Sequence, residues 1–169
     1  MIKILEKTFK VILNMLIILV IIALIILMYG RIQMKVTGND YPNYFGYTFF
    51  KVTSGSMKEE LQVGDVVVIK LHSNFKENDI ITFTADNNFI THRIIKIDNN
   101  MITTKGDANN SKDKVITKDK VLGKVVYKIE EMAILREILT TPEILLFIFL
   151  TVLFFNLAFS YKNKYQKID

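Results

Sequence analysis

The sequence contains no cysteine and only two histidines, His72 and His92. The missing thiols exclude disulfides, thiolate zinc sites and a cysteine nucleophile. Two histidines are too few for a histidine-rich metal site. We therefore expect neither a metal nor another cofactor.

Positive charge is in excess, with a net charge of +5 and an isoelectric point near 9.3. A nucleic-acid-binding domain gathers its basic residues on one face or along one helix. Here the lysines are scattered, and several of them flank apolar runs. The charge therefore favours a membrane location, and we expect no nucleic acid as a partner.

The 169 residues are enough for one domain with a modest core. Hydrophobic residues make up 50% of the chain and the mean hydropathy is +0.27. They are concentrated at the two ends, in residues 11–29 and 144–161, whereas the middle has an ordinary globular composition.

Both apolar runs have the length of a membrane span. About twenty apolar residues in a helix cross the hydrocarbon core. In the first run only Asn14 is strongly polar, and “GRIQMK” after it lacks a small-residue cleavage pattern, so we expect an uncleaved anchor. The second run follows Pro142, which suits a first helical turn, and it contains Thr151 and Asn156. A buried soluble helix for the first run and a re-entrant or peripheral helix for the second are the alternatives.

Lysines flank both runs on the side of the chain termini. They are Lys3, Lys7 and Lys10 at the start and Lys162, Lys164 and Lys167 at the end. The positive-inside tendency predicts that the tails 1–10 and 162–169 are cytoplasmic. Residues 30–130 would then form a domain on the outer face of the cell membrane, with both termini inside.

The middle of the chain has the pattern of an all-β domain. Six runs show period-two alternation or β-branched richness: 47–54, 64–71, 78–85, 88–97, 100–106 and 120–129. Short turns rich in Asn, Asp and Gly separate them. We predict a mainly β domain, a compact sheet or partial barrel, between two transmembrane α-helices spanning 11–29 and 142–161. In the connector 131–141, Met132, Leu135 and Leu139 share one helical face.

A hydroxyl, an imidazole and two carboxylates follow one another through this domain. Ser56 lies next to Gly55, which allows close backbone approach and unusual torsions, and Ser54 offers a second hydroxyl. His92 is a candidate general base, because its unperturbed pKa suits proton transfer near neutral pH. Asp107 and Asp113, in “TKGDANNSKDK”, are candidate orienting acids. Each residue alone is more often a turn, strand or solvated loop residue.

Four segments in order, “SGSM”, “VGDVVVIK”, “THRIIKI” and “TKGDANNSKD”, resemble the boxes of type I signal peptidases. The resemblance runs from about residue 52 to 124 and includes the flanking anchors. With His92 where the common bacterial branch has a lysine, the chain resembles the branch of the endoplasmic reticulum, archaea and some Gram-positive bacteria. That resemblance implies a signal-peptidase-like β fold and a membrane-bound serine endopeptidase that cuts signal peptides after small residues.

The resemblance also implies roles for individual residues. Ser56 matches the nucleophile and His92 the general base, while Ser54 and the backbone N–H of Ser56 match the oxyanion donors. Asp107 and Asp113 match the two acids of the last box. Spacing alone leaves open which of them orients His92. We favour Asp113, with Asp107 shaping the loop and with Gly106 permitting its tight turn.

One position departs from the family pattern, and other functions stay open. Where the family has a proline, two residues after the methionine, this chain has Glu59. A Ser–Lys peptidase with Lys96 or Lys105 as base is one alternative, and no role is assigned to His72. A non-catalytic module in secretion or surface-fibre assembly and a lipid-binding β domain are others. The expected partners are signal-peptide-bearing precursors and the lipid bilayer, with the secretion translocon as a further candidate.

Overall fold

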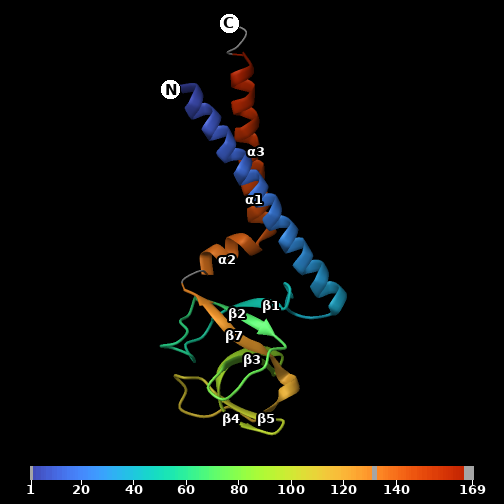
Figure 1. Ribbon diagram of the computed structural model, residues 1–169, viewed down its shortest axis with the longest axis vertical. Coiled ribbons are helices and arrows are strands. Elements are labelled where there is room, and N and C mark those ends of the chain that lie inside the picture. The colour runs from blue at the N-terminus through green and yellow to red at the C-terminus, as the bar shows by residue number, and fades with distance from the viewer. Residues whose placement is uncertain (1, 131–132, 166–169) are drawn as a thin grey trace. The chain divides into compact units, whose positions relative to one another are not determined.

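The computed structural model describes residues 2–130 and 133–165. The chain divides into a helical unit, drawn from residues 1–32 and 137–169, and a second unit of residues 33–136 that carries the sheet. The predicted fold class, a mainly β domain flanked in sequence by two long apolar helices, is confirmed, and the sheet is antiparallel (Figure 1).

The sheet has seven strands in the order β1-β2-β7-β3-β4-β5-β6, and all pairs are antiparallel. The strands are β1 (Tyr47–Lys51), β2 (Val66–Leu71), β3 (Ile80–Ala85), β4 (Asn88–Asp98), β5 (Met101–Lys105), β6 (Ile116–Thr117) and β7 (Val121–Ile129). Each of the six predicted runs corresponds to one strand, and β4 extends one residue beyond its run. The short β6 and the 3-10 turn η1 (Lys118–Lys120) after it were not predicted, because two residues carry no periodic pattern.

In strands β4 and β5 the buried side chains alternate along the strand. In β5, Ile102 and Thr104 are buried while Met101 is exposed, and in β4 His92 and Ile94 are buried. Successive side chains of a strand point to opposite faces, so these four residues share the inner face of the β4–β5 pair. A polar pair on this face, His92 and Thr104, therefore lies beside an apolar core.

Two apolar clusters form that core. The first contains Met57, Leu61, Val67 and Ile69, which join the loop after β1 to strand β2. The second contains Ile81, Phe83, Ile94 and Ile102 from strands β3, β4 and β5. The loop that contains Ser56 is thus packed on one cluster, and the strand that contains His92 on the other.

Among the described residues, two helices are long and apolar enough to cross a membrane: α1 (Ile2–Thr37) and α3 (Pro142–Tyr165). α1 is longer than the apolar run 11–29, and it ends at Thr37. Gly38 follows, and its φ of 72° and the bond from its N–H to the Met34 carbonyl (2.9 Å) form a C-terminal cap. α3 begins at Pro142, the position that its missing N–H favours.

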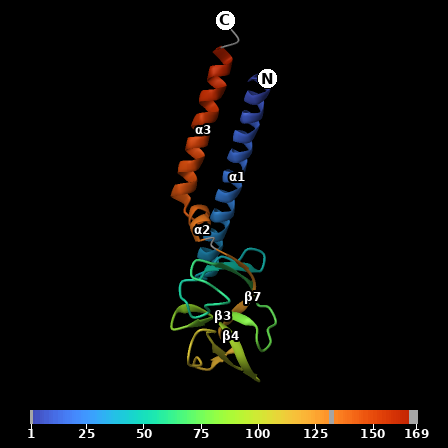
Figure 2. The same cartoon turned by 90° about the vertical axis from the view of Figure 1, so that its left-hand side faces the viewer.

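Within the helical unit the two helices run in opposite directions, so the start of α1 and the end of α3 lie at the same end (Figures 1 and 2). The amide of Asn156 donates to Oδ1 of Asn14 at 2.6 Å. These are two of the polar residues noted in the apolar runs, and their bond satisfies one polar group of each span.

The short helix α2 (Ala133–Thr140) lies in the segment predicted as an amphipathic connector. Met132, one of the three residues predicted on its apolar face, lies outside the described residues.

Candidate active site

The loop that contains Ser56 is closed by backbone hydrogen bonds at its base. The N–H of Val52 donates to the Asp65 carbonyl (2.8 Å), and the N–H of Gly64 donates to the Val52 carbonyl (3.0 Å). Just after Ser56, the side chain of Met57 is 2% exposed. Ser56 itself is half-buried. Its backbone is therefore held between a closed loop base and a side chain anchored in the core.

Ser56 and His92 line one cavity of about 310 Å³. Ser54 also lines it, and its Oγ lies 3.2 Å from the Oγ of Ser56. The walls are mostly apolar, from residues Phe50, Val52, Met57, Leu61, Val67, Phe89 and Ile90. The cavity thus combines two hydroxyls and an imidazole with an apolar lining, the combination expected of a binding site for an apolar group.

His92 is oriented by a carboxylate from residues 104–113, which we call the acidic loop. Its side chain lies on β4 and the residue is 6% exposed. Nδ1 of His92 lies 2.6 Å from Oδ2 of Asp113. An ionised carboxylate only accepts hydrogen bonds, so Nδ1–H is the donor, and in the neutral imidazole the lone pair is then on Nε2. The imidazole therefore has the tautomer in which Nε2 can accept a proton.

Asp107, the other acid of the loop, contacts Arg93 instead. Nε of Arg93 donates to its Oδ1 (2.9 Å) and Nη2 to its Oδ2 (2.7 Å). Hydrogen bonding to Asp107 raises the pKa of Arg93, although burial lowers it. In this arrangement Asp113 faces the imidazole of His92, and Asp107 binds Arg93, the next residue in the chain.

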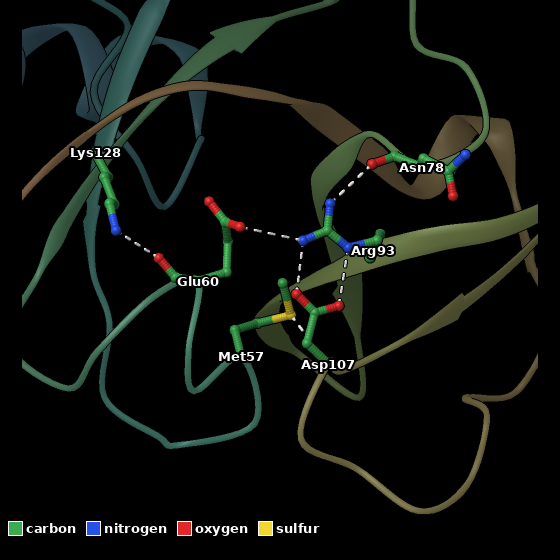
Figure 3. A network of polar contacts seen from close by, with 6 residues as sticks. All are labelled: Met57, Glu60, Asn78, Arg93, Asp107 and Lys128. Carbon is green, nitrogen blue, oxygen red and sulfur yellow. Dashed lines mark hydrogen bonds and ion pairs between the residues drawn. The ribbon is translucent and has the colours of Figure 1, made fainter.

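Arg93 joins further segments, as Figure 3 shows. Its Nη1 donates to the Asn78 carbonyl (3.0 Å), and its Nη2 lies 3.6 Å from a carboxylate oxygen of Glu60. The N–H of Asp107 approaches the sulfur of Met57 at 3.4 Å. One guanidinium thus ties strand β4 to the loop after Ser56 and to the acidic loop.

Gly106 and Gly55, the two glycines singled out in the sequence, differ in their surroundings. A Cβ on Gly106 would lie 2.6 Å from the carbonyl oxygen of Ser56, which also accepts the N–H of Ala108 at 2.9 Å. Around Gly55 a Cβ would meet nothing within 4 Å, and its φ is not positive. The close approach expected of a glycine is therefore found at Gly106, and the unusual torsion expected at Gly55 is not.

Among the described residues no hydrogen bond joins Ser56 to His92; the two share the cavity without that contact. Catalytic hydrogen bonds are often long in a free enzyme and shorten when substrate binds. The geometry is that of a hydroxyl and an imidazole facing one cavity, with the imidazole already oriented by Asp113.

The lysines considered as alternative bases lie elsewhere. The side chain of Lys96 is 67% exposed, and its Nζ lies 3.3 Å from Asp98. Lys105, on β5, lies opposite Arg93 of β4 in the sheet register. Neither lysine lines the cavity of Ser56. His72, given no role, follows β2 with a φ of 49° and lines a different cavity.

Two features of the site were missed from the sequence. The Oγ1 of Thr104, a fully buried residue, donates to Oδ2 of Asp113 at 2.7 Å. The alternation of β5 could have placed Thr104 on the inner face, but not against Asp113. Glu59, where the family has a proline, has a φ of 88°. Because the proline ring holds φ near −65°, the backbone here differs from any that proline would adopt.

Comparison with known proteins shows a family and a relative to which this chain is similar. A family model described as Peptidase S24-like matches residues 32–126, more than half of the chain. Signal peptidase I W of Bacillus subtilis (strain 168) is 36% identical over 118 residues, which are 65% of this chain and 62% of that protein. The matched part therefore spans less than two thirds of the relative.

Proposed function

The chain belongs to the Peptidase S24-like family and is related to type I signal peptidases, and from this premise we propose that it is a membrane-bound serine endopeptidase that removes signal peptides from secreted precursors. The observation that supports this most is the shared cavity of Ser56 and His92, with Nδ1 of His92 bonded to Asp113 at 2.6 Å. Such an array activates a hydroxyl for acyl transfer.

In the proposed mechanism Ser56 is the nucleophile and His92 the general base. Nε2 of His92 takes the Oγ proton as Oγ attacks the scissile carbonyl carbon. His92 then gives that proton to the leaving amine, and water hydrolyses the ester to free Ser56. Asp113 orients the imidazole and stabilises its charged form. The hydrogen bond at Nδ1 supports this role, since it directs Nε2 to the proton transfer.

The negative oxygen of the tetrahedral intermediate needs donors. We assign them to the hydroxyl of Ser54 and the backbone N–H of Ser56. The separation of 3.2 Å between the two Oγ atoms supports a position of Ser54 within reach of the reacting carbonyl. Donors of this kind, fixed before reaction, commonly lower the barrier by about 3 kcal/mol.

As substrates we propose precursors with an apolar signal segment and a cleavage site that ends in small residues. The mostly apolar walls of the cavity beside Ser56 support an apolar side chain next to the scissile bond. We further propose that the two spans place both tails in the cytoplasm and the β domain outside, where cleavage sites emerge. A tether in the same membrane raises the effective concentration of substrate.

The test is cleavage of a precursor with a small-residue site by the full-length protein in detergent. Ser56→Ala and His92→Ala should abolish product, because each removes a reacting group. The matched controls are Ser111→Ala, in the exposed part of the acidic loop, and His72→Ala, the other histidine. Both should cleave as the unaltered protein does.

Other results would point to other functions. Activity that survives His92→Ala would indicate that a lysine is the general base. Lys105→Ala and Lys96→Ala are then the next variants. An unaltered protein that is inert on every precursor tried, in the presence of lipid, would favour the non-catalytic module.

A further inference from the structure

Thr104 is a fully buried polar residue that shares the inner face of the β4–β5 pair with two isoleucines and His92. On β5 its neighbour on the inner face is Ile102, and its partner across the strands is Ile94 on β4. Both isoleucines belong to the second core cluster and are 0% exposed. A buried hydroxyl without a partner is costly, so its hydrogen bond decides what the residue does there.

That hydrogen bond goes to the carboxylate that faces the imidazole. Oγ1 of Thr104 donates to Oδ2 of Asp113 at 2.7 Å, and Nδ1 of His92 lies 2.6 Å from the same oxygen. One carboxylate oxygen thus accepts two hydrogen bonds. With both acceptor positions of Oδ2 filled, the carboxylate plane has one favoured orientation.

The backbone adds a second contact between the same two residues. The N–H of Asp113 donates to the carbonyl of Thr104 at 2.9 Å. Residues 104 and 113 are the two ends of the acidic loop, which carries Asp107 in between. Asp113 is therefore held by Thr104 through main chain and side chain together.

We propose that Thr104 is a positioning residue, which fixes the Asp113 carboxylate so that it holds His92 in the reactive orientation. This inference rests on the proposed function for its effect on rate, but the contact itself does not. Thr104 touches neither the cavity nor a reacting atom. Its effect must therefore pass through Asp113.

The central variant is Thr104→Val, which keeps the shape of the side chain and removes the hydroxyl. We expect kcat to fall about tenfold with KM unchanged, since a hydrogen bond to an ionised group is lost without a change in the cavity. Thr104→Ser, which restores the hydroxyl, should recover most of the rate. Thr48→Val is the matched control: Thr48 is equally buried on a strand, and its hydroxyl has no partner within the described residues.

A double-variant cycle separates positioning from general damage. In an Asp113→Ala background, Thr104→Val should cause no further loss of kcat, because the group through which it acts is gone. An equal tenfold loss in both backgrounds would overturn the proposal, as would a Thr104→Val protein with normal kcat.

A readout that needs no substrate keeps this proposal distinct from the proposed function. In the Ser56→Ala protein, the Nδ1 proton of His92 should give a low-field NMR resonance that Asp113→Ala removes. Thr104→Val should shift or broaden it, whereas Thr48→Val should leave it unchanged. If Thr104→Val leaves this resonance unaltered, the positioning role is wrong even for an active peptidase. If the resonance responds but no precursor is cut, only the proposed function fails.

Discussion

Gly106 packs against the carbonyl group of Ser56 so closely that a Cβ on residue 106 would lie 2.6 Å from that oxygen. The same carbonyl accepts the N–H of Ala108 at 2.9 Å. The acidic loop is thus docked on the backbone of the proposed nucleophile. Any side chain at residue 106 must separate the two.

Gly106→Ala should therefore lower both stability and activity. We expect a loss of about 1–3 kcal/mol in the free energy of unfolding, the range for a side chain forced into a packed site, together with a large fall in kcat. Gly55→Ala is the control for stability, because a Cβ there meets nothing within 4 Å. Urea unfolding of both variants checks this, and equal stabilities would contradict it.

Glu59 has a φ of 88°, a backbone region that side chains rarely adopt and glycine adopts freely. Glu59→Gly should raise the free energy of unfolding by about 1 kcal/mol, and Glu59→Pro should lower it by more than that, since proline cannot reach this φ. Lys58→Gly is the control, because Lys58 is also exposed but its φ is not positive. That variant should not raise the free energy of unfolding. A stabilising Glu59→Pro would show that the turn adopts the family's conformation.

Asp113→Asn and Asp107→Asn should fail in different ways. Loss of the carboxylate at Asp113 removes the group that selects the tautomer of His92, so kcat should fall by about 10⁴ with the fold intact. Asp107→Asn breaks the bidentate pair with Arg93 and should cost about 1 kcal/mol of stability, with a smaller loss of rate. Steady-state kinetics and thermal melts of both variants distinguish these outcomes. The reverse pattern would exchange the roles of the two acids.

The ion pair of Asp79 with Lys124, 2.8 Å long, should make stability depend on pH in the acid range. Burial raises the pKa of Asp79, but hydrogen bonds from Lys124 and from the N–H of Lys76 lower it more, so that it lies below its ordinary 3.8. A carboxyl with a lowered pKa contributes stability above about pH 4, and this stability is lost as the pH falls through the folded-state pKa.

Asp79→Asn should accordingly cost up to about 1 kcal/mol at pH 7 and less at pH 3. Asp98→Asn is the matched control, because Asp98 pairs with Lys96 on the surface, where both side chains are about two-thirds exposed (65% and 67%). That variant should change stability little at either pH. Melting curves at the two pH values decide the matter, and a deficit of Asp79→Asn that grows toward pH 3 would refute the sign.

The absence of cysteine makes the proposed orientation in the membrane directly testable. In intact cells an impermeant maleimide should label Lys120→Cys, in the β domain, and should label Lys10→Cys only after the membrane is opened. We expect this because lysines flank both spans on the side of the chain termini, and the positive-inside tendency predicts that this side is cytoplasmic. Labelling of Lys10→Cys in intact cells, with Lys120→Cys protected, would reverse the orientation.

Local patterns predicted most of the fold because they report local physics. Alternation or richness in β-branched residues marked each of the longer strands, and in β5 the alternation corresponds to one buried face. Continuous apolar runs marked α1 and α3, because their length and hydropathy carry the signal. The ends of α1 were not predictable in this way, since its first and last turns lie outside the continuous apolar run and contain Lys3 and Lys35.

The sequence by itself determined which groups could react, a hydroxyl at Ser56, an imidazole at His92 and two acids six residues apart, and that thiol chemistry is excluded. Only the tertiary structure decided that Asp113 faces His92 while Asp107 faces Arg93, and that Thr104 holds the former. The physical reason is that each contact joins residues 9 to 21 positions apart on different strands and loops. Their meeting depends on sheet register and on the packing of Gly106, which no local pattern encodes.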